Sequence, residues 1–358
     1  MLRFISQRVL AAVPVLLGIL FVTFALARLL PGDPCRAMLG EKATDQICDA
    51  FNVRYGLDKP ITTQFGIYIK DVAQGDLGQS FRYGRPVTQL IVERLPVTVE
   101  LSLAALIFAT VVGILAGLWS AYRRNSIVDV VTMIIANIGV SMPVFWLGLM
   151  LAYLFALTLK DTPFQLPPSG RNSPGLIVPT IQEAWNLNLQ PGLLNSAISF
   201  LSNMHLFSSL LTLNLPVFWD TFRHMILPAV ALGTIPLSII ARMTRSSLLD
   251  VLSLDYVRTA RAKGLNERRV VLRHGMRNAL IPVVTIIGLS LGSLLGGAVL
   301  TETIFNLAGV GRILFDAIQA RDYAIVQGFT LIIAAAYVII NLFVDLLYAF
   351  LDPRVRLG

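Results

Sequence analysis

Long apolar runs separated by shorter polar segments dominate this sequence. An α-helix needs about 20 predominantly apolar residues to cross the hydrocarbon core of a bilayer. The third run is longer than one span requires, and Pro143 predicts a kink within it because proline removes a helical hydrogen bond. The stretch 193–215 is too rich in asparagine and serine to span and is expected to lie outside the membrane. The runs that predict transmembrane helices, about six in all, are residues 9–28, 98–119, 130–159, 225–248, 280–300 and 326–350.

The composition agrees with a chain embedded in lipid. Charged residues make up 14% of the sequence and hydrophobic residues 55%, whereas about a quarter of a soluble domain is charged. We therefore predict an all-α integral membrane protein with extracytoplasmic loops. The first run follows Arg3 and Arg8, but it is longer than the apolar region of a secretory signal and is expected to be retained as an anchor.

The positions of lysine and arginine predict the orientation, because short loops rich in these residues stay in the cytoplasm. With the N-terminus inside, the cytoplasmic pieces are 1–8, 122–129, 242–279 and 351–358, and they hold about half of the basic residues. The predicted topology is N-in and C-in. The net charge of +8 has this origin and does not indicate a nucleic-acid partner.

The spans and loops divide the chain into consecutive segments. In order, the predicted segments are 1–28, the cytoplasmic start and first span; 29–97, extracytoplasmic; 98–159, the second and third spans; 160–224, an extracytoplasmic insert; 225–350, the last three spans with a cytoplasmic loop at 249–282; and 351–358, a cytoplasmic tail.

Both cysteines, Cys35 and Cys48, fall in the first extracytoplasmic segment. An oxidising compartment would permit a disulfide between them. Two free thiols are the alternative, and the sequence does not choose between the two.

Four residues of the third run, Asn137, Ser141, Met142 and Trp146, fall in one broad sector of a helix. Polar groups within a span usually face the protein interior or a water-filled path. These residues are therefore candidates to line a solute path, with contacts between helices as the alternative.

Ionisable groups also occur in later spans. Asn341 and Asp345 lie four residues apart in the last run, and Arg242 lies at a similar depth in the fourth. Because a lone charge is costly in the membrane, we expect a structural ion pair or a snorkelling aspartate here.

Glycines recur at a spacing of four in two spans. Gly288, Gly292 and Gly296 form such a series in the fifth run, and Gly113 with Gly117 repeats it in the second. Small residues at this spacing let helix backbones approach closely, so we expect them to be helix-packing positions.

The sequence gives no sign of catalysis. It contains no phosphate-binding glycine loop, and His205, His224 and His274 are scattered without metal-ligand spacing. We expect no catalytic residue, no metal site and no cofactor bound by this chain. Energy for transport would have to come from another subunit or from an ion gradient.

The longest cytoplasmic loop, 249–282, predicts two helices with a break between them. Ser253 is expected to cap the first helix, Asp255 to favour its positive end and Gly264 to end it in a left-handed conformation. Asn266 then caps a second helix, on which Arg269, Arg273 and Arg277 recur at a spacing of four.

One side of the first helix carries the small residues Val257, Ala260 and Gly264. A short rigid helix at the end of a bundle can transmit the movement of a partner without bending. We therefore expect this loop to be a docking surface rather than only a topological signal.

At these residues the sequence resembles permease subunits of binding-protein-dependent ABC importers, in the dipeptide, oligopeptide and nickel branch. Residues 258–264 and 280–282 resemble the EAA loop of that family. Further matching motifs run along the whole chain, at 30–34, 55–60, 75–81, 95–101, 302–305, 309–311, 321–323 and 352–354.

The resemblance implies the type I ABC importer permease fold in a bacterial or archaeal plasma (inner) membrane. The implied partners are a second homologous permease, two cytoplasmic ATPase subunits or domains that bind ATP and Mg, an extracytoplasmic solute-binding protein and membrane lipid. We expect the small face of the first loop helix to enter a groove of an ATPase. The residues implied for this coupling loop are Asp255, Tyr256, Val257, Arg258, Thr259, Ala260, Arg261, Lys263 and Gly264.

The sequence departs from the family pattern at the signature glutamate, which is Arg258, and at the first alanine, which is Thr259. The segment 172–223 is longer than the resemblance leads us to expect. Di- or oligopeptides are the expected solutes, with nickel and oligosaccharides as alternatives within the family. The competing function is a secondary transporter driven by an ion gradient, with Glu100 or Asp345 as its coupling carboxylate.

Overall fold

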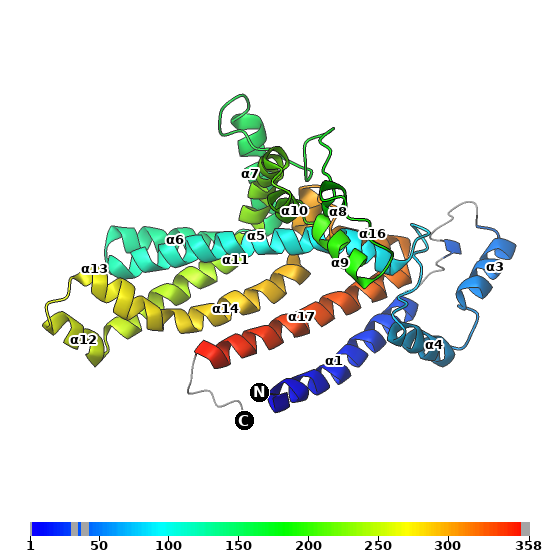
Figure 1. Cartoon of the computed structure of the whole chain (residues 1–358), viewed down its shortest axis with the longest axis horizontal. Helices are drawn as coiled ribbons and strands as arrows, with labels where there is room; N and C mark the ends of the chain where they lie inside the picture. The colour runs from blue at the N-terminus through cyan, green and yellow to red at the C-terminus, as the bar shows by residue number, and fades with distance from the viewer. Residues whose placement is uncertain (1, 30–34, 37–42, 352–358) are drawn as a thin grey trace. The chain divides into compact units, whose positions relative to one another are not determined.

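The computed structural model describes residues 2–29, 35–36 and 43–351 and is built from helices (Figure 1). Within these residues the only β-type pairing is an isolated bridge between Gln79 and Pro86. Five helices are long and apolar enough to cross a membrane, and a sixth span results if one bent helix pair is a single crossing. The prediction of an all-α membrane protein with about six spans is confirmed.

The spanning helices begin before the apolar windows of the sequence. For example, α11 begins at Leu215 because the side chain of Asn214 accepts a hydrogen bond from the Val217 amide and Pro216 occupies the first turn. Hydropathy locates the membrane-embedded part, whereas a capping residue sets where α11 starts. The long helices are α1 (Leu2–Leu29), α5 (Val87–Tyr122), α11 (Leu215–Leu252), α14 (Met276–Gly297) and α17 (Tyr323–Leu351).

The third predicted span is broken at Pro143. Helix α6 (Ile127–Ser141) ends there, and the pair α7 (Val144–Ala152) and π-helical η2 (Tyr153–Thr158) continues at 105° to it. Met142 has an extended backbone, with φ −82° and ψ 128°, because the ring of a following proline disfavours the helical region. The expected bend is therefore present, and it is a full break.

The chain forms two compact units, and the first contains the described residues of Met1–Val97, Thr180–Met204 and Ala308–Val338. Its core packs Leu90, Ile313 and Phe329 around the start of α5. Cys35 and Cys48 form a disulfide. Of the two alternatives left open by the sequence, a disulfide or two free thiols, the structure has the disulfide. The shorter helices of this unit are α3 (Asp45–Tyr55), α4 (Ile61–Ala73), α8 (Ile181–Ala184), α9 (Leu193–Ser202) and α16 (Val310–Ala320).

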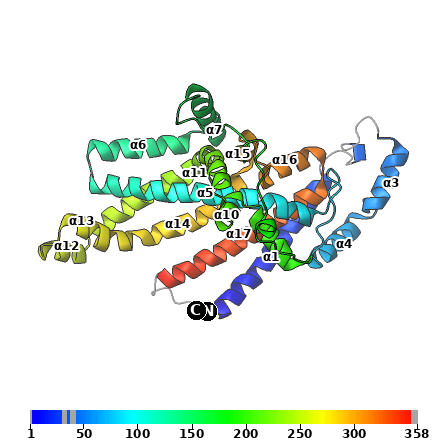
Figure 2. The same cartoon turned by 45° about the horizontal axis from the view of Figure 1, so that its top comes forward.

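The second unit contains Thr98–Pro179, His205–Leu307 and the described part of Ile339–Gly358, with α11 at its centre. Helices α6 and α14 run alongside α11 in both views (Figures 1 and 2), and both contact it. The shorter elements of this unit are α10 (His205–Leu211), α12 (Asp255–Ala262), α13 (Glu267–Arg269), π-helical η3 (Val270–Gly275) and α15 (Val299–Ile304).

The predicted insert between the third and fourth spans consists of turns and short helices. Its most apolar helix, α9, has 10 residues, which is well short of the roughly 20 needed to cross a bilayer. A capping box formed by Thr180 and Glu183 begins α8. The stretch 193–215 therefore does not form a span of its own.

Candidate docking helix and solute path

Helix α12 begins at Asp255, directly after the end of α11. Its N-cap is Leu254, which has an extended backbone and no side-chain capping bond. The expectation that Ser253 caps α12 is wrong: its hydroxyl donates to the Asp250 carbonyl at 2.7 Å, and the residue is the C-cap of α11. Asp255 lies in the first turn as predicted, where its carboxylate favours the positive end of the helix.

Gly264 ends α12 in the predicted left-handed conformation, with φ +75°. Its amide donates to the Arg261 carbonyl at 2.9 Å, as at many helix ends. Asn266 then caps α13, because its side chain accepts a hydrogen bond from the Arg268 amide at 3.0 Å. The predicted order of helix, glycine break and second helix is confirmed.

The second helix of the loop is irregular. It consists of α13, the π-helical turn η3 and then α14. A π-helical turn is wider than an α-helical turn, so residues four apart rotate away from one another. Arg269, Arg273 and Arg277 are all exposed, but the segment that carries them is not one continuous α-helix.

The small face of α12 packs against its own chain. Val257 is 0% exposed and Ala260 is 7% exposed, and both belong to a cluster with Val270, Leu252 and Leu265. The hypothesis that this face enters an ATPase groove is therefore wrong. The glycine break folds α13 and η3 back beside α12, which brings Val270 onto that face.

Three side-chain interactions brace α12. Arg261 bonds to both carboxylate oxygens of Glu267, and this partner raises the pKa of the Arg261 guanidinium. The Tyr256 hydroxyl donates to the His274 carbonyl at 3.2 Å and accepts from the Asn278 amide at 2.7 Å. The helix is thus tied directly to α14, and the residues of its outer side that stay exposed include Arg258, Thr259 and Lys263.

The candidate path residues lie on both sides of the break at Pro143. Asn137 and Ser141 belong to α6, Met142 forms the break and Trp146 lies on α7. The four therefore do not occupy one sector of a continuous helix as expected, because the chain turns by 105° between them. Their role in lining a solute path remains a prediction.

Asn137 lines an open cavity of about 500 Å³ between α6, α11 and α14. Arg242 donates to the Asn137 side chain at 3.3 Å, so the polar partner found for this arginine is on α6 rather than on the last span. Ile239 and Ile286 form apolar walls of the same cavity. This is the candidate solute path that the second unit offers.

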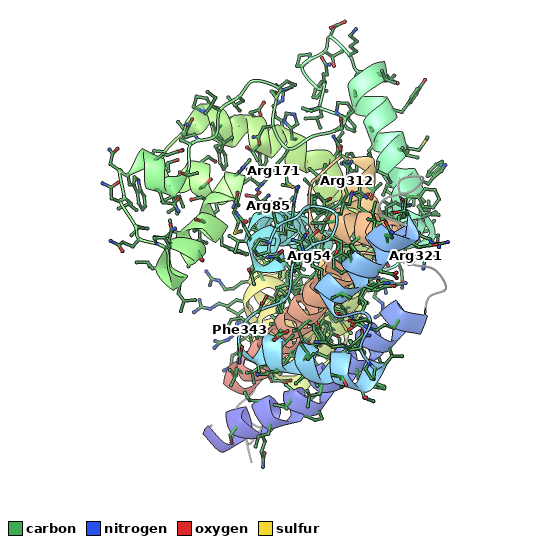
Figure 3. The ribbon with its side chains drawn as sticks, turned by 90° about the vertical axis from the view of Figure 1, so that its right-hand side faces the viewer. Arg54, Arg85, Arg171, Arg312, Arg321 and Phe343 are labelled. Atoms are coloured by element: carbon green, nitrogen blue, oxygen red, sulfur yellow. A yellow bond between two sulfur atoms is a disulfide. The ribbon has the colours of Figure 1, made fainter. Side chains whose placement is uncertain are left out.

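A buried polar network, which the sequence did not predict, joins α5, α10 and the loop before α8. Glu100 is 4% exposed and accepts hydrogen bonds from Arg171 at 2.5 Å and from the Leu206 amide at 2.6 Å. Arg171 (labelled in Figure 3) comes from the loop before α8. Glu100, the carboxylate considered for ion coupling, is thus engaged in holding this loop and α10 in place.

The same network continues through His205, whose Nδ1 lies 2.6 Å from the Asn172 side chain. Burial, and then the positive charge of Arg171, lower the pKa of His205 to about 3. The imidazole is therefore neutral at physiological pH. Asn172 also donates to Thr221 at 2.6 Å, which attaches the loop to α11.

Comparison with known protein families decides the class of this molecule. The family described as binding-protein-dependent transport system inner membrane component matches residues 113–357, and the model of its N-terminal part matches residues 1–103. The chain belongs to this permease family. The permease is thus the membrane-spanning component of a transport system that also depends on a binding protein.

Curated relatives match the permease over nearly its whole length. The dipeptide transport system permease protein of Alkalihalophilus pseudofirmus is 44% identical over 99% of this chain and 100% of its own. The di/tripeptide transport system permease protein of Pseudomonas aeruginosa is 44% identical over 99% of each chain. The glutathione transport system permease protein of Salmonella choleraesuis is 37% identical over 99% of each.

These matches correct one expectation about length. Since the Alkalihalophilus relative aligns over 100% of its length with 99% of the permease, the permease has almost no extra chain relative to it. The segment 172–223 is therefore not additional length in comparison with that dipeptide permease.

The glycine series of the permease show where helices approach closely. A Cβ atom added at Gly288 would meet Val344 of α17 at 2.3 Å, and one at Gly117 would meet the Ala241 carbonyl of α11 at 2.5 Å. Gly113 also packs against α11, whereas a Cβ at Gly296 would meet nothing within 4 Å. The packing prediction is confirmed for Gly288, Gly113 and Gly117 and is wrong for Gly296, which is exposed. Gly292 is buried.

Proposed function

We propose that this permease is one of two homologous membrane subunits of an ABC importer for di- and tripeptides, with both termini in the cytoplasm. A binding protein delivers the solute outside, and two ATPase subunits bind ATP and Mg²⁺ inside. Movement of the ATPases changes the side of the membrane to which the central path opens.

The support for short peptides comes from the relatives. Two proteins that are 44% identical to the permease are named as dipeptide and di/tripeptide permeases. The glutathione permease at 37% identity also carries a tripeptide by its name. Short peptides are the solute class that these three names share.

The observation that carries the proposed coupling is the bracing of α12. Its apolar side is used inside the chain, and its outer side presents Arg258, Thr259 and Lys263. Two of these side chains are cationic, so we expect acidic groups on the facing ATPase surface. Such exposed charge pairs should each add at most about 1 kcal/mol to docking.

A contiguous set of contacts links α12 to the candidate path. Tyr256 is bonded to Asn278 at the start of α14, and Ile286 of the same helix lines the cavity beside Arg242. A displacement of α12 would therefore move α14 directly. This linkage supports the proposed role of α12 as the element that carries ATPase movement to the path.

Uptake into proteoliposomes tests the proposed function. The permease, co-expressed with its partner subunits, should accumulate labelled dialanine only when ATP and binding protein are present, and an uncoupler should not reduce uptake. Excess unlabelled tripeptide should compete, while nickel and oligosaccharide should not. Uptake that needs an ion gradient and no ATP would instead establish a secondary transporter.

Replacing Gly264 by valine should uncouple this transporter. A β-branched residue at φ +75° is strained by about 1–2 kcal/mol, and the strain is relieved if the end of α12 unwinds. We expect dialanine uptake to fall by about tenfold, with ATP hydrolysis retained. The measurement is uptake per ATP hydrolysed.

Gly264→Asn is the matched control, because asparagine tolerates the left-handed region far better than valine. A Cβ atom at this position meets nothing within 4 Å, so backbone conformation is the only difference that the two variants test. Near-normal coupling in the valine variant would show that the geometry of α12 does not control transport.

A further inference from the structure

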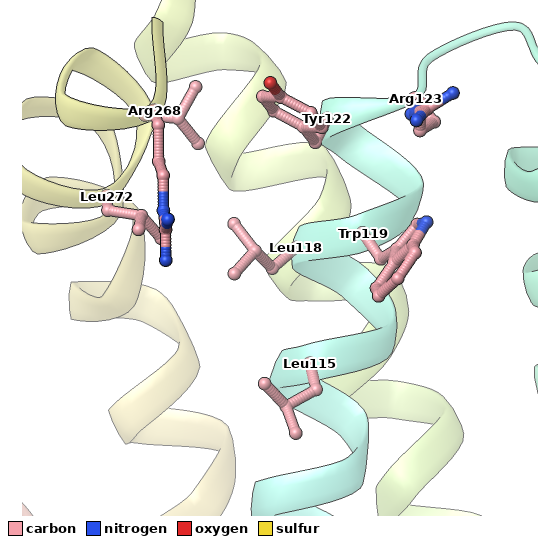
Figure 4. A pocket seen from close by; sticks show the side chains of 8 residues that line it. Leu115, Leu118, Trp119, Tyr122, Arg123, Arg268 and Leu272 are labelled. Atoms are coloured by element: carbon pink, nitrogen blue, oxygen red, sulfur yellow. The ribbon is translucent and has the colours of Figure 1, made fainter. Parts of the chain in front are cut away.

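An apolar groove lies between the end of α5 and the segment formed by α13 and η3. Its volume is about 280 Å³, and its walls include Leu115, Leu118 and Leu272. Trp119 and Tyr122 stand beside it at the end of α5 (Figure 4). Tryptophan and tyrosine are enriched where the hydrocarbon core meets the headgroups, so the groove lies at the depth of that boundary.

Two arginines, Arg123 and Arg268, complete the lining of the groove. Figure 4 shows the Arg268 side chain extending along the wall past Leu272, with its guanidinium level with Leu118. Within the described part of the chain neither arginine has a side-chain hydrogen bond or a salt bridge. By contrast, Arg245 and Arg261 nearby are bonded to carboxylates.

The groove lining therefore carries a net positive charge. It contains these two cations and no acidic residue. The neighbouring cavity, in contrast, includes both Arg261 and its partner Glu267. An arginine beside an apolar wall and without a carboxylate is best satisfied by a phosphate, to which guanidinium can donate two parallel hydrogen bonds.

The apolar wall continues along α5 away from the arginines. Ile107, Val111, Leu115 and Trp119 recur every four residues and are 52–64% exposed. They form a stripe about three turns long that starts in the groove. An acyl chain fits such a stripe, since it is apolar, extended and parallel to the helix.

We propose that this groove binds an anionic phospholipid in the leaflet on the side of α12. The phosphate bonds to Arg268, Arg123 adds a second positive charge at the rim, and one acyl chain lies along the stripe from Leu115 towards Ile107. Basic pockets between helices at the membrane boundary bind lipid headgroups in this way. The site touches Val271 of η3, so a bound lipid supports the turn on which α12 rests.

Native mass spectrometry of the purified full chain, co-expressed with its partners, tests the proposal. Phosphatidylglycerol and phosphatidylethanolamine with identical acyl chains are titrated separately. We expect the wild type to retain phosphatidylglycerol preferentially and Arg268→Gln to weaken that binding by about tenfold. Arg123→Gln should have a smaller effect, because this arginine lies at the rim.

Arg269→Gln is the matched control, since Arg269 is the exposed neighbour of Arg268 and does not line the groove. Its lipid retention should equal that of the wild type, and thermal melting should confirm that all variants are folded. Glycerol phosphate at the same concentration should not displace the lipid, because it lacks the acyl chain.

Three results would overturn the proposal. The first is equal retention of the two lipids by the wild type, and the second is an equal loss in the Arg268 and Arg269 variants. The third comes from a photoreactive residue placed at Leu115: crosslinking to a protein subunit instead of lipid would show that a partner covers the groove. Crosslinking to phosphatidylglycerol would support the lipid site directly.

Discussion

Replacing Gly117 by valine is expected to disrupt the packing of α5 on α11. A Cβ at this position would lie 2.5 Å from the Ala241 carbonyl oxygen and 3.1 Å from the Arg245 amide nitrogen. Both obstacles are backbone atoms of α11, so no change of side-chain rotamer relieves the clash. We expect a loss of about 3 kcal/mol in unfolding free energy, measured by denaturant titration in detergent.

Gly296→Val is the control for this experiment. It adds the same side chain to a spanning helix, at a position where a Cβ meets nothing within 4 Å. Its effect should stay below about 1 kcal/mol, the usual cost or gain of such a change in a helix. Equal destabilisation by the two variants would mean that β-branching, and not close helix contact, explains the loss at Gly117.

Removing the carboxylate of Asp129 is the second change with a large expected effect. Asp129 is 4% exposed, and both of its oxygens accept 2.7 Å hydrogen bonds from Arg245 of α11. Ser120 of α5 and the Asn125 amide complete its partners. One carboxylate therefore joins α5, α6 and α11.

Asp129→Ala should destabilise the permease by about 3 kcal/mol, because Arg245 is left without its charge partner. The joint replacement Asp129→Leu with Arg245→Met should recover most of the loss, since no unpaired charge remains. Asp255→Ala is the exposed comparison: its pair with Arg258 has side chains 94% and 72% exposed, and its loss should cost less than about 1 kcal/mol. Thermal melting of the purified variants measures all three, and equal shifts for Asp129 and Asp255 would refute the argument.

Local sequence signals predicted the two helices and the break of the loop 249–282. Gly264 and Asn266 have the conformations that their residue types favour, because a left-handed glycine and an asparagine cap depend on only a few neighbouring residues. Ser253 was the exception. A residue at the junction of two helices can cap either helix, and here Ser253 is the C-cap of α11.

Local sequence signals could not predict which part of the chain buries the small face of α12. Small residues on one face predict that something packs closely there, but they do not identify it. The partner proved to be Val270 of the same chain. This outcome depends on the π-helical turn η3, which brings that valine back onto the face and which has no clear sequence signature.

The polar network around Glu100 shows the same limit. Glu100 and Arg171 are 71 residues apart in the sequence, and neither residue alone indicates the other. Their pairing depends on the path of the loop between the third and fourth spans. A charge in a span therefore predicts only that a partner exists.

The sequence by itself determined the membrane class, the approximate spans, a bend at Pro143 and most of the glycine positions where helices meet. Each depends on local composition or on the conformation of a few adjacent residues. Only the tertiary structure decided which face of α12 stays free, which carboxylates hold which arginines and where two arginines remain without acidic partners beside an apolar groove. Those features arise from contacts between residues far apart in the chain. The contacts contribute interaction free energy only once the helices have packed together.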